Sequence, residues 1–250
     1  MADASHTRRA PSSTDGVLLA LLAAAWRIPA LLAPTHLVFD DGVYGSALLT
    51  MRVGNVPFRD VWSPQGPAHL AVLWWFDLVG GRTSWSPRLG PVVAGVVVVL
   101  ATHSFVLRLV GRVPAIASGV LVALTGSLAW VTGPITGDGP ALAWAMVALA
   151  GTARLAEQPS TLTGLAVGVA AACALSTKVL VAPVLLFAVA VVAPALRRDA
   201  AVRRSLAAAA GSGIVVSAVW WTAFGFSAAW EQSIRYHTAT PRIKIGRAHV

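Results

Sequence analysis

Three aspartates stand out among the residues that could do chemistry, because acidic residues are scarce in this chain. Asp40 and Asp41 form an adjacent pair and Asp138 lies in the segment TGDGP, in a sequence with ten acidic residues among 250. A carboxylate at a reaction centre can accept a proton from an attacking hydroxyl group. Simpler explanations stay open, since an acidic pair can be merely solvated and an aspartate before glycine favours a turn or caps a helix.

A few other polar residues could either take part in a functional site or serve only to stabilise the fold. Arg59 and Asp60 are adjacent and can pair with each other in a turn, which is worth little when exposed. Lys178 interrupts an apolar run, where its side chain can extend to the membrane surface or serve a site. Tyr44 could stack against a substrate or lie in an aromatic belt. Arg27 falls within an apolar run with no acidic neighbour, so we expect it to face the interior of a helix bundle.

The composition identifies the elements that must hold these residues in place. Hydrophobic residues make up 56% of the chain and charged residues 12%, with a mean hydropathy of +0.72, whereas about 25% of residues are charged in an ordinary soluble domain. These values exclude a soluble globule and a disordered chain, and favour membrane helices. One cysteine, Cys173, excludes a disulfide framework and a thiolate metal cluster.

The positive net charge of +9 does not indicate a nucleic-acid partner. Basic residues that bind phosphate backbones gather on one solvated face, but here they form short clusters between apolar runs. This pattern is typical of cytoplasmic anchoring of membrane helices.

Seven apolar runs are candidate membrane spans, and together they predict an all-α, polytopic transmembrane bundle. The runs cover residues 16–38, 89–107, 114–133, 140–153, 162–177, 179–196 and 205–226. An eighth segment, Ala68 to Gly80, has 13 residues and would reach only about 20 Å, short of the hydrocarbon core of about 30 Å. We therefore expect it to be an amphipathic helix on the outer surface.

Charge asymmetry decides the expected topology. With the short segment outside the membrane and the N-terminus in the cytoplasm, nine arginines face the cytoplasm and five basic residues face outward before the last loop. The nine are Arg8, Arg9, Arg108, Arg112, Arg154, Arg197, Arg198, Arg203 and Arg204, and the five are Arg52, Arg59, Arg82, Arg88 and Lys178. Residues 38–87 then form one long outer loop, on the same side of the membrane as Asp138.

The string FDDGVYGSALLTMRVGNVPFRDVWSPQGPAHL resembles the first outer loop of GT-C glycosyltransferases. Within that class it is most similar to the branch of protein O-mannosyltransferases and aminoarabinose transferases, of the glycosyltransferase family 39 type. The shared features are an acidic pair, a following tyrosine, a G-x-P-F-R-D turn, a Gly-Pro element and a later aspartate, which are here Asp40-Asp41, Tyr44, Gly54 with Pro57 to Asp60, Gly66-Pro67 and Asp138. Two positions depart from the family: Asp41 replaces a common glutamate, and Gln65 replaces a His or Lys.

The resemblance implies a function and roles for these residues. It implies transfer of a sugar from a polyprenyl-phosphate donor to an acceptor hydroxyl of a lipid, polysaccharide or protein, on the outer side of a bacterial plasma membrane and with inversion at the sugar. Asp40 would be the general base, with Asp41 and Asp138 completing the catalytic set, and no cofactor is implied, although a divalent cation is not excluded. The residues expected to bind substrate are Tyr44, Arg59, Asp60, Gln65, Arg88 and Lys178.

The alternative function is a polytopic transporter or lipid flippase, which should instead place its ionisable residues near the membrane midplane. We expect a cytoplasmic arm at residues 1–15 and a truncated transmembrane domain at residues 16–243, with a loop beginning near Ser227. The final residues, KIGRAHV at 244–250, look like a sequencing-adapter artefact. The chain is therefore expected to be an N-terminal fragment that is inactive alone.

Overall fold

The computed structural model of the protein describes residues 13–32 and 37–239, and these are almost entirely helical. The first helices along the chain are α1 (Ser13–Leu32), α2 (Phe39–Arg52), α3 (Pro67–Val79), the short 3-10 helix η1 (Ser86–Arg88) and α4 (Leu89–Leu109). Those that follow are α5 (Arg112–Leu124), α6 (Gly126–Thr132), α7 (Asp138–Glu157), α8 (Thr161–Thr177), η2 (Val179–Val181), α9 (Ala182–Arg198), α10 (Ala200–Ala223), α11 (Phe226–Trp230), η3 (Glu231–Arg235) and α12 (Tyr236–Ala239).

The all-α bundle predicted from the apolar runs is confirmed. Five helical segments are long and apolar enough to cross a membrane: Thr14–Leu32, Ser86–Leu109, Asp138–Glu157, Val179–Arg198 and Ala200–Ala223. The helices α5 and α6 pass the same test together, although they are bent by 59° at their junction, and would make a sixth span. The remaining predicted span corresponds to α8, an apolar helix of 17 residues.

The segment that was too short to span is the helix α3, and it is more deeply buried than a surface helix. Pro67 begins it at a position that needs no backbone N–H. Leu70 and Leu73 are fully buried against α2 in one hydrophobic cluster, whereas Trp75 is 62% exposed. This first loop therefore contains two helices, α2 and α3, that pack on each other and on the bundle.

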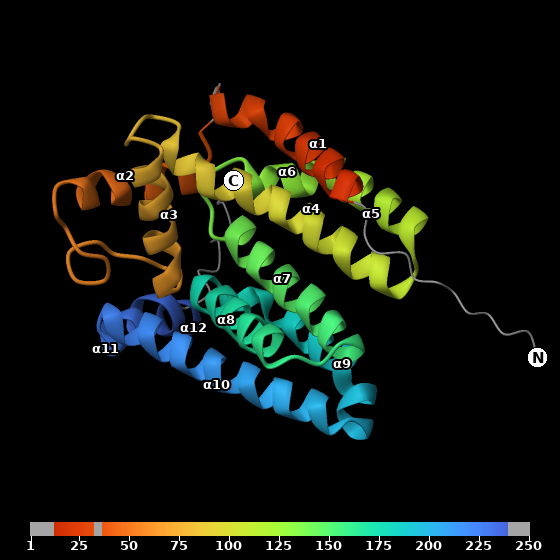
Figure 1. The fold of residues 1–250 in the computed structure, drawn as a ribbon. Coiled ribbons are helices and arrows are strands. Elements are labelled where there is room, and N and C mark those ends of the chain that lie inside the picture. Colours follow the sequence, from red (N-terminus) through yellow and green to blue (C-terminus); the bar gives the residue numbers. More distant parts are fainter. Residues whose placement is uncertain (1–12, 33–36, 240–250) are drawn as a thin grey trace, which may run out of the picture.

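Four short helices gather at one end of the bundle, which we call the site end. Figure 1 shows α2, α3, α11 and α12 at the left, where α4 and α7 begin and α8 and α10 finish. The segment after α10, expected to be a loop, is helical and lies over the first loop, since Gln232 accepts a hydrogen bond from the backbone N of Ser63 at 3.0 Å and donates one to the backbone O of Phe58 at 2.8 Å. The predicted arm at 1–15 and tail at 244–250 lie outside the described residues, except for the first residues of α1.

Arg27 faces the bundle interior, as expected. Its guanidinium is buried and donates to the hydroxyl of Thr132 at 2.8 Å and to the backbone oxygen of Ala123 at 3.4 Å. Ala123 lies next to the α5–α6 junction, where the bend interrupts the regular helix hydrogen bonds. The arginine therefore holds α1 against the break in the span.

Candidate functional site

Six polar side chains from separate parts of the sequence come together at the site end, and we call this set the polar centre. Its members are Asp40, Tyr44, Gln65, His69, Asp138 and Lys178. Asp40 and Tyr44 lie one turn apart on α2, so they point to the same side of the helix. The other four come from the segment before α3, the first turn of α3, the start of α7 and the residue after α8.

Three charged residues form one half of the polar centre. The ammonium of Lys178 lies 2.7 Å from a carboxylate oxygen of Asp138. Asp40 is half-buried beside this pair, and within residues 13–32 and 37–239 no group donates a hydrogen bond to its carboxylate. Burial raises the pKa of Asp40, the positive charge of Lys178 lowers it, and the negative charges of Asp138 and Asp41 raise it further, with a net shift upward. An unpaired carboxylate of raised pKa is a stronger base than an ordinary aspartate once it is ionised.

Three neutral residues form the other half. The ring of Tyr44 meets the imidazole of His69 edge to face, with centroids 4.5 Å apart and planes at 83°. Burial raises the pKa of Tyr44 to about 12, although a hydrogen bond with Gln65 lowers it in part. The phenol therefore keeps its proton at physiological pH.

His69 is the residue that the sequence did not single out. It is completely buried, and neither of its ring nitrogens has a hydrogen-bond partner within the described part of the chain. Burial, with a smaller contribution from the charge of Lys178, lowers the pKa of His69 to about 3, so the imidazole is neutral. In the sequence it is one histidine in an apolar run, a pattern that most often marks a core residue. Its position two residues after Pro67 is the one signal that could have indicated it.

Asp41 and Arg88 contact each other, and neither is a member of the polar centre. The Arg88 guanidinium donates to Asp41 at 3.0 Å and to the backbone oxygen of Ala30 at 2.8 Å. Asp41 also accepts from the backbone N–H groups of Val38 at 3.1 Å and Ile135 at 2.8 Å. Both side chains are buried, so each serves to join α2, α4, the end of α1 and the segment before α7.

Arg59 and Asp60 lie in an exposed turn and bind each other, with a shortest distance of 2.9 Å. The Arg59 guanidinium and the backbone N–H of Val56 donate to Asp60 and lower its pKa. No contact in the described residues joins either side chain to the polar centre. The simpler explanation considered for this pair, mutual pairing in a turn, matches its geometry.

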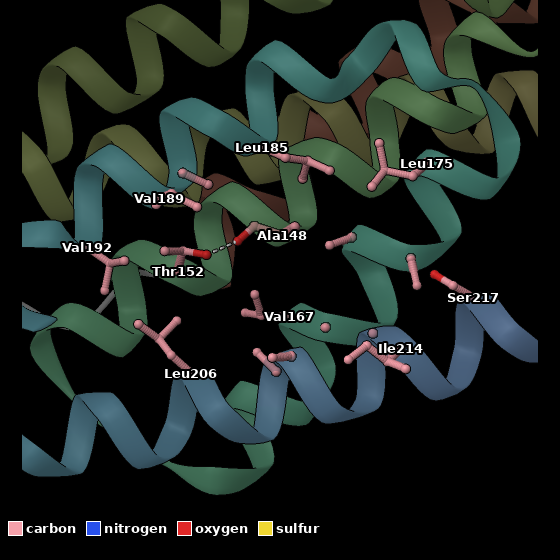
Figure 2. Close-up of a pocket in the computed structure, with 17 residues that line it drawn as sticks. Ala148, Thr152, Val167, Leu175, Leu185, Val189, Val192, Leu206, Ile214 and Ser217 are labelled. Atoms are coloured by element: carbon pink, nitrogen blue, oxygen red, sulfur yellow. Dashed lines mark hydrogen bonds between the residues drawn. The ribbon is translucent and has the colours of Figure 1, made fainter.

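A second feature is an apolar pocket of about 560 Å³ between α7, α8, α9 and α10. Figure 2 shows Leu185 and Val192 reaching it from α9, and Leu206 and Ile214 from α10. Leu175 of α8 also lines the pocket and lies three residues before Lys178, which is about 4.5 Å along a helix axis. One lining residue of the pocket is therefore close in sequence to Lys178, a member of the charged half of the polar centre.

Metal ligands are not assembled in the described residues. No group of three or more His, Cys, Asp or Glu side chains there is arranged to hold an ion.

The fold and the site together define a multi-pass helical membrane protein with a polar centre at one end of the bundle. The chain belongs to the dolichyl-phosphate-mannose-protein mannosyltransferase family, whose model matches residues 64–222, well over half of the sequence. No curated protein matches the chain. The family makes the protein a membrane glycosyltransferase of the mannosyltransferase type and confirms the GT-C resemblance, so it favours this class over a transporter or flippase. The match includes Gln65, His69, Asp138 and Lys178, whereas Asp40 and Tyr44 precede it.

Proposed function

We propose that the protein transfers a hexose or pentose from a polyprenyl-phosphate donor to an acceptor hydroxyl, with Asp40 as the general base. The observation that carries this proposal is the unpaired, half-buried carboxylate of Asp40 beside the ion pair of Asp138 and Lys178. The acceptor is a lipid, a polysaccharide or a protein. The proposed location is a bacterial plasma membrane, with the N-terminus in the cytoplasm and the site end outside.

In the proposed reaction, Asp40 takes the proton of the acceptor hydroxyl as its oxygen attacks C1 of the sugar. The bond between C1 and the phosphate oxygen breaks, and the phosphate leaves with the bonding electron pair on the opposite face, which inverts the configuration at C1. A leaving phosphate is stabilised by positive charge placed where its negative charge develops. Lys178 is the cation of the polar centre, and Asp138 holds its ammonium in position at 2.7 Å. No cofactor is part of this proposal.

Two of the expected substrate-binding cations are assigned differently. Arg88 is engaged by Asp41 and by a backbone oxygen, so we assign it to positioning α2, which carries Asp40. Arg59 is 71% exposed and bound to Asp60, so it has no part in the proposed transfer step.

The apolar pocket supports a lipid-linked donor. Its lining consists of alkyl side chains and small residues, with Thr152 and Ser217 as hydroxyl-bearing members. The Thr152 hydroxyl donates to the backbone oxygen of Ala148 at 2.7 Å, so its polar group is already satisfied (Figure 2). We propose that part of the polyprenyl chain lies in this pocket while its phosphate reaches Lys178.

The proposal is tested by transfer of labelled sugar from a panel of polyprenyl-phosphate sugars in membranes that contain a completed version of the protein, with Asp40→Asn measured in parallel. Loss of a general base is expected to lower the rate by about 10²- to 10⁴-fold. Asp199→Asn is the matched control, because Asp199 is an exposed cap of α10 and asparagine caps helices equally well. Equal rates for Asp40→Asn and the wild type would remove Asp40 from the mechanism, and no transfer from any donor would contradict the proposed function.

A further inference from the structure

Two polar atoms of the neutral half of the polar centre lie beside Gly137. An atom placed where a Cβ would project from Gly137 lies 3.4 Å from Oε1 of Gln65 and 3.4 Å from Nδ1 of His69. Residue 137 is glycine, so no side chain fills this position. Its backbone torsions, φ of −79° and ψ of −15°, are open to any residue, so the backbone conformation does not require glycine here.

The imidazole of His69 is unusual in this setting. A buried polar group without a hydrogen bond is destabilising, and His69 has two ring nitrogens in that condition within the described residues. A neutral imidazole presents one donor and one acceptor, which matches a hydroxyl group because a hydroxyl also donates and accepts. A phosphate is better matched by a cation, and the nearby cation, Lys178, belongs to the charged half.

We propose that His69 and Gln65 bind hydroxyl groups of the transferred sugar in the space above Gly137. This inference rests on the proposed function and deepens it, because it separates the site into a part that holds the sugar and a part that holds the phosphate. The sugar lies against Gln65, His69 and the ring of Tyr44, and the phosphate lies against Lys178. Asp40, one turn from Tyr44 on α2, faces the boundary between the two parts, where C1 of the sugar must be.

Two probes separate sugar recognition from phosphate recognition. The first is a short polyprenyl phosphate that carries mannose, and the second is the same polyprenyl phosphate without the sugar. Their binding to the 250-residue chain in detergent is measured for the wild type and for His69→Leu. We expect His69→Leu to weaken binding of the mannosyl lipid by about tenfold or more, and to leave binding of the unsugared lipid unchanged. His69→Asn retains a donor and an acceptor, so it should retain most of the affinity.

His103 provides the matched control. It is also a buried histidine, and its Nε2 has no hydrogen-bond partner among the described residues, but it lies in the second half of α4. His103→Leu should leave binding of both lipids unchanged. If His69 only fills the core, His69→Leu will instead behave like His103→Leu, or will weaken both lipids equally with a matching loss of thermal stability, and either result would overturn the inference.

A second variant tests the space itself. Gly137→Ala places a methyl group in ordinary contact with Gln65 and His69, so the fold should remain intact while the sugar position is filled. We expect the same selective loss of mannosyl-lipid binding. Gly211→Ala is the control, because a Cβ there meets nothing within 4 Å. Failure of the wild type to bind the mannosyl lipid would contradict the proposed function, whereas wild-type binding that both Gly137→Ala and His69→Leu retain would contradict this inference alone.

Discussion

Asp41 and Arg88 form a buried ion pair, with a carboxylate oxygen of one 3.0 Å from a guanidinium nitrogen of the other and side chains 2% and 6% exposed. The pair joins the start of α2 to the start of α4. Asp40, the adjacent residue in the sequence, has no such partner in the described residues and faces Lys178 and Asp138 instead. The two members of the acidic pair therefore have different surroundings: Asp41 is bound to Arg88, whereas Asp40 accepts no hydrogen bond within the described residues.

The ion pair makes a prediction about stability. Asp41→Asn should leave the guanidinium of Arg88 buried without its counter-charge, and removal of one partner from a buried pair costs about 3 to 5 kcal/mol. Arg88→Met should have a similar cost. Unfolding by denaturant in detergent measures both, and the double variant should lose less than the sum of the single variants. A variant that lowers transfer activity while keeping full stability would be inconsistent with this structural role.

The raised pKa of Asp40 predicts the pH dependence of transfer. A general base acts in its ionised form, so the rate should fall as the pH drops through a pKa above the ordinary aspartate value of 3.8. Lys178 lowers this pKa and Asp138 raises it. Lys178→Gln should therefore move the acid limb of kcat/KM to higher pH, and Asp138→Asn should move it to lower pH. The quantity to measure is the pH at which kcat/KM has fallen to half its plateau value, because both variants also change the plateau itself.

The same shift has a consequence for stability. Between the ordinary and the raised pKa of Asp40, the folded chain binds more protons than the unfolded chain, so the free energy of unfolding decreases as the pH rises through that interval. Asp40→Asn should remove this dependence. Unfolding measured across the interval tests the sign, and a wild-type stability that instead rises because of Asp40 would contradict the assigned environment.

Close packing of α8 on α10 makes a prediction about the bundle. A Cβ on Gly164 would overlap the backbone oxygen of Ser205, and one on Gly168 would overlap that of Ala209. This is the close approach expected of a G-x-x-x-G motif. Gly168→Val should destabilise the fold by about 1 to 3 kcal/mol through overpacking, as measured by thermal unfolding in detergent. Gly211→Ala on α10, where a Cβ meets open space, should have no such effect, and equal stability of the two variants would rule out close packing at Gly168.

The apolar pocket makes a prediction about lipid binding. Ala210 lines it from α10, so Ala210→Phe should fill part of the volume and weaken binding of a long polyprenyl phosphate more than binding of a short one. Val215, on the same helix, is 61% exposed and does not line the pocket. Val215→Phe should leave both affinities unchanged, and an equal effect of the two variants would show that the chain binds elsewhere.

Much of the architecture could be predicted from the sequence, because apolar runs of membrane length leave few alternatives to a helix. Topology also placed Asp40, Asp138 and Lys178 on one side of the membrane, although it did not show that Lys178 lies 2.7 Å from Asp138. The different surroundings of Asp40 and Asp41 could not be predicted, since neighbours on a helix point about 100° apart and only the tertiary contacts decide which side meets Arg88. His69 was missed because a lone histidine in an apolar run carries no pattern.

The backbone N–H of Gly66 donates to the backbone oxygen of Thr177 at 3.1 Å, and a Cβ on Gly66 would overlap the backbone of Ser176. The residues that flank this bond are Gln65 and Lys178, one from each half of the polar centre. The bond therefore joins the segment that carries Gln65, proposed to hold the sugar, to the end of α8, which precedes Lys178, proposed to hold the phosphate. We therefore expect a tilt of α8 to move both groups together, with little change in the distance between them.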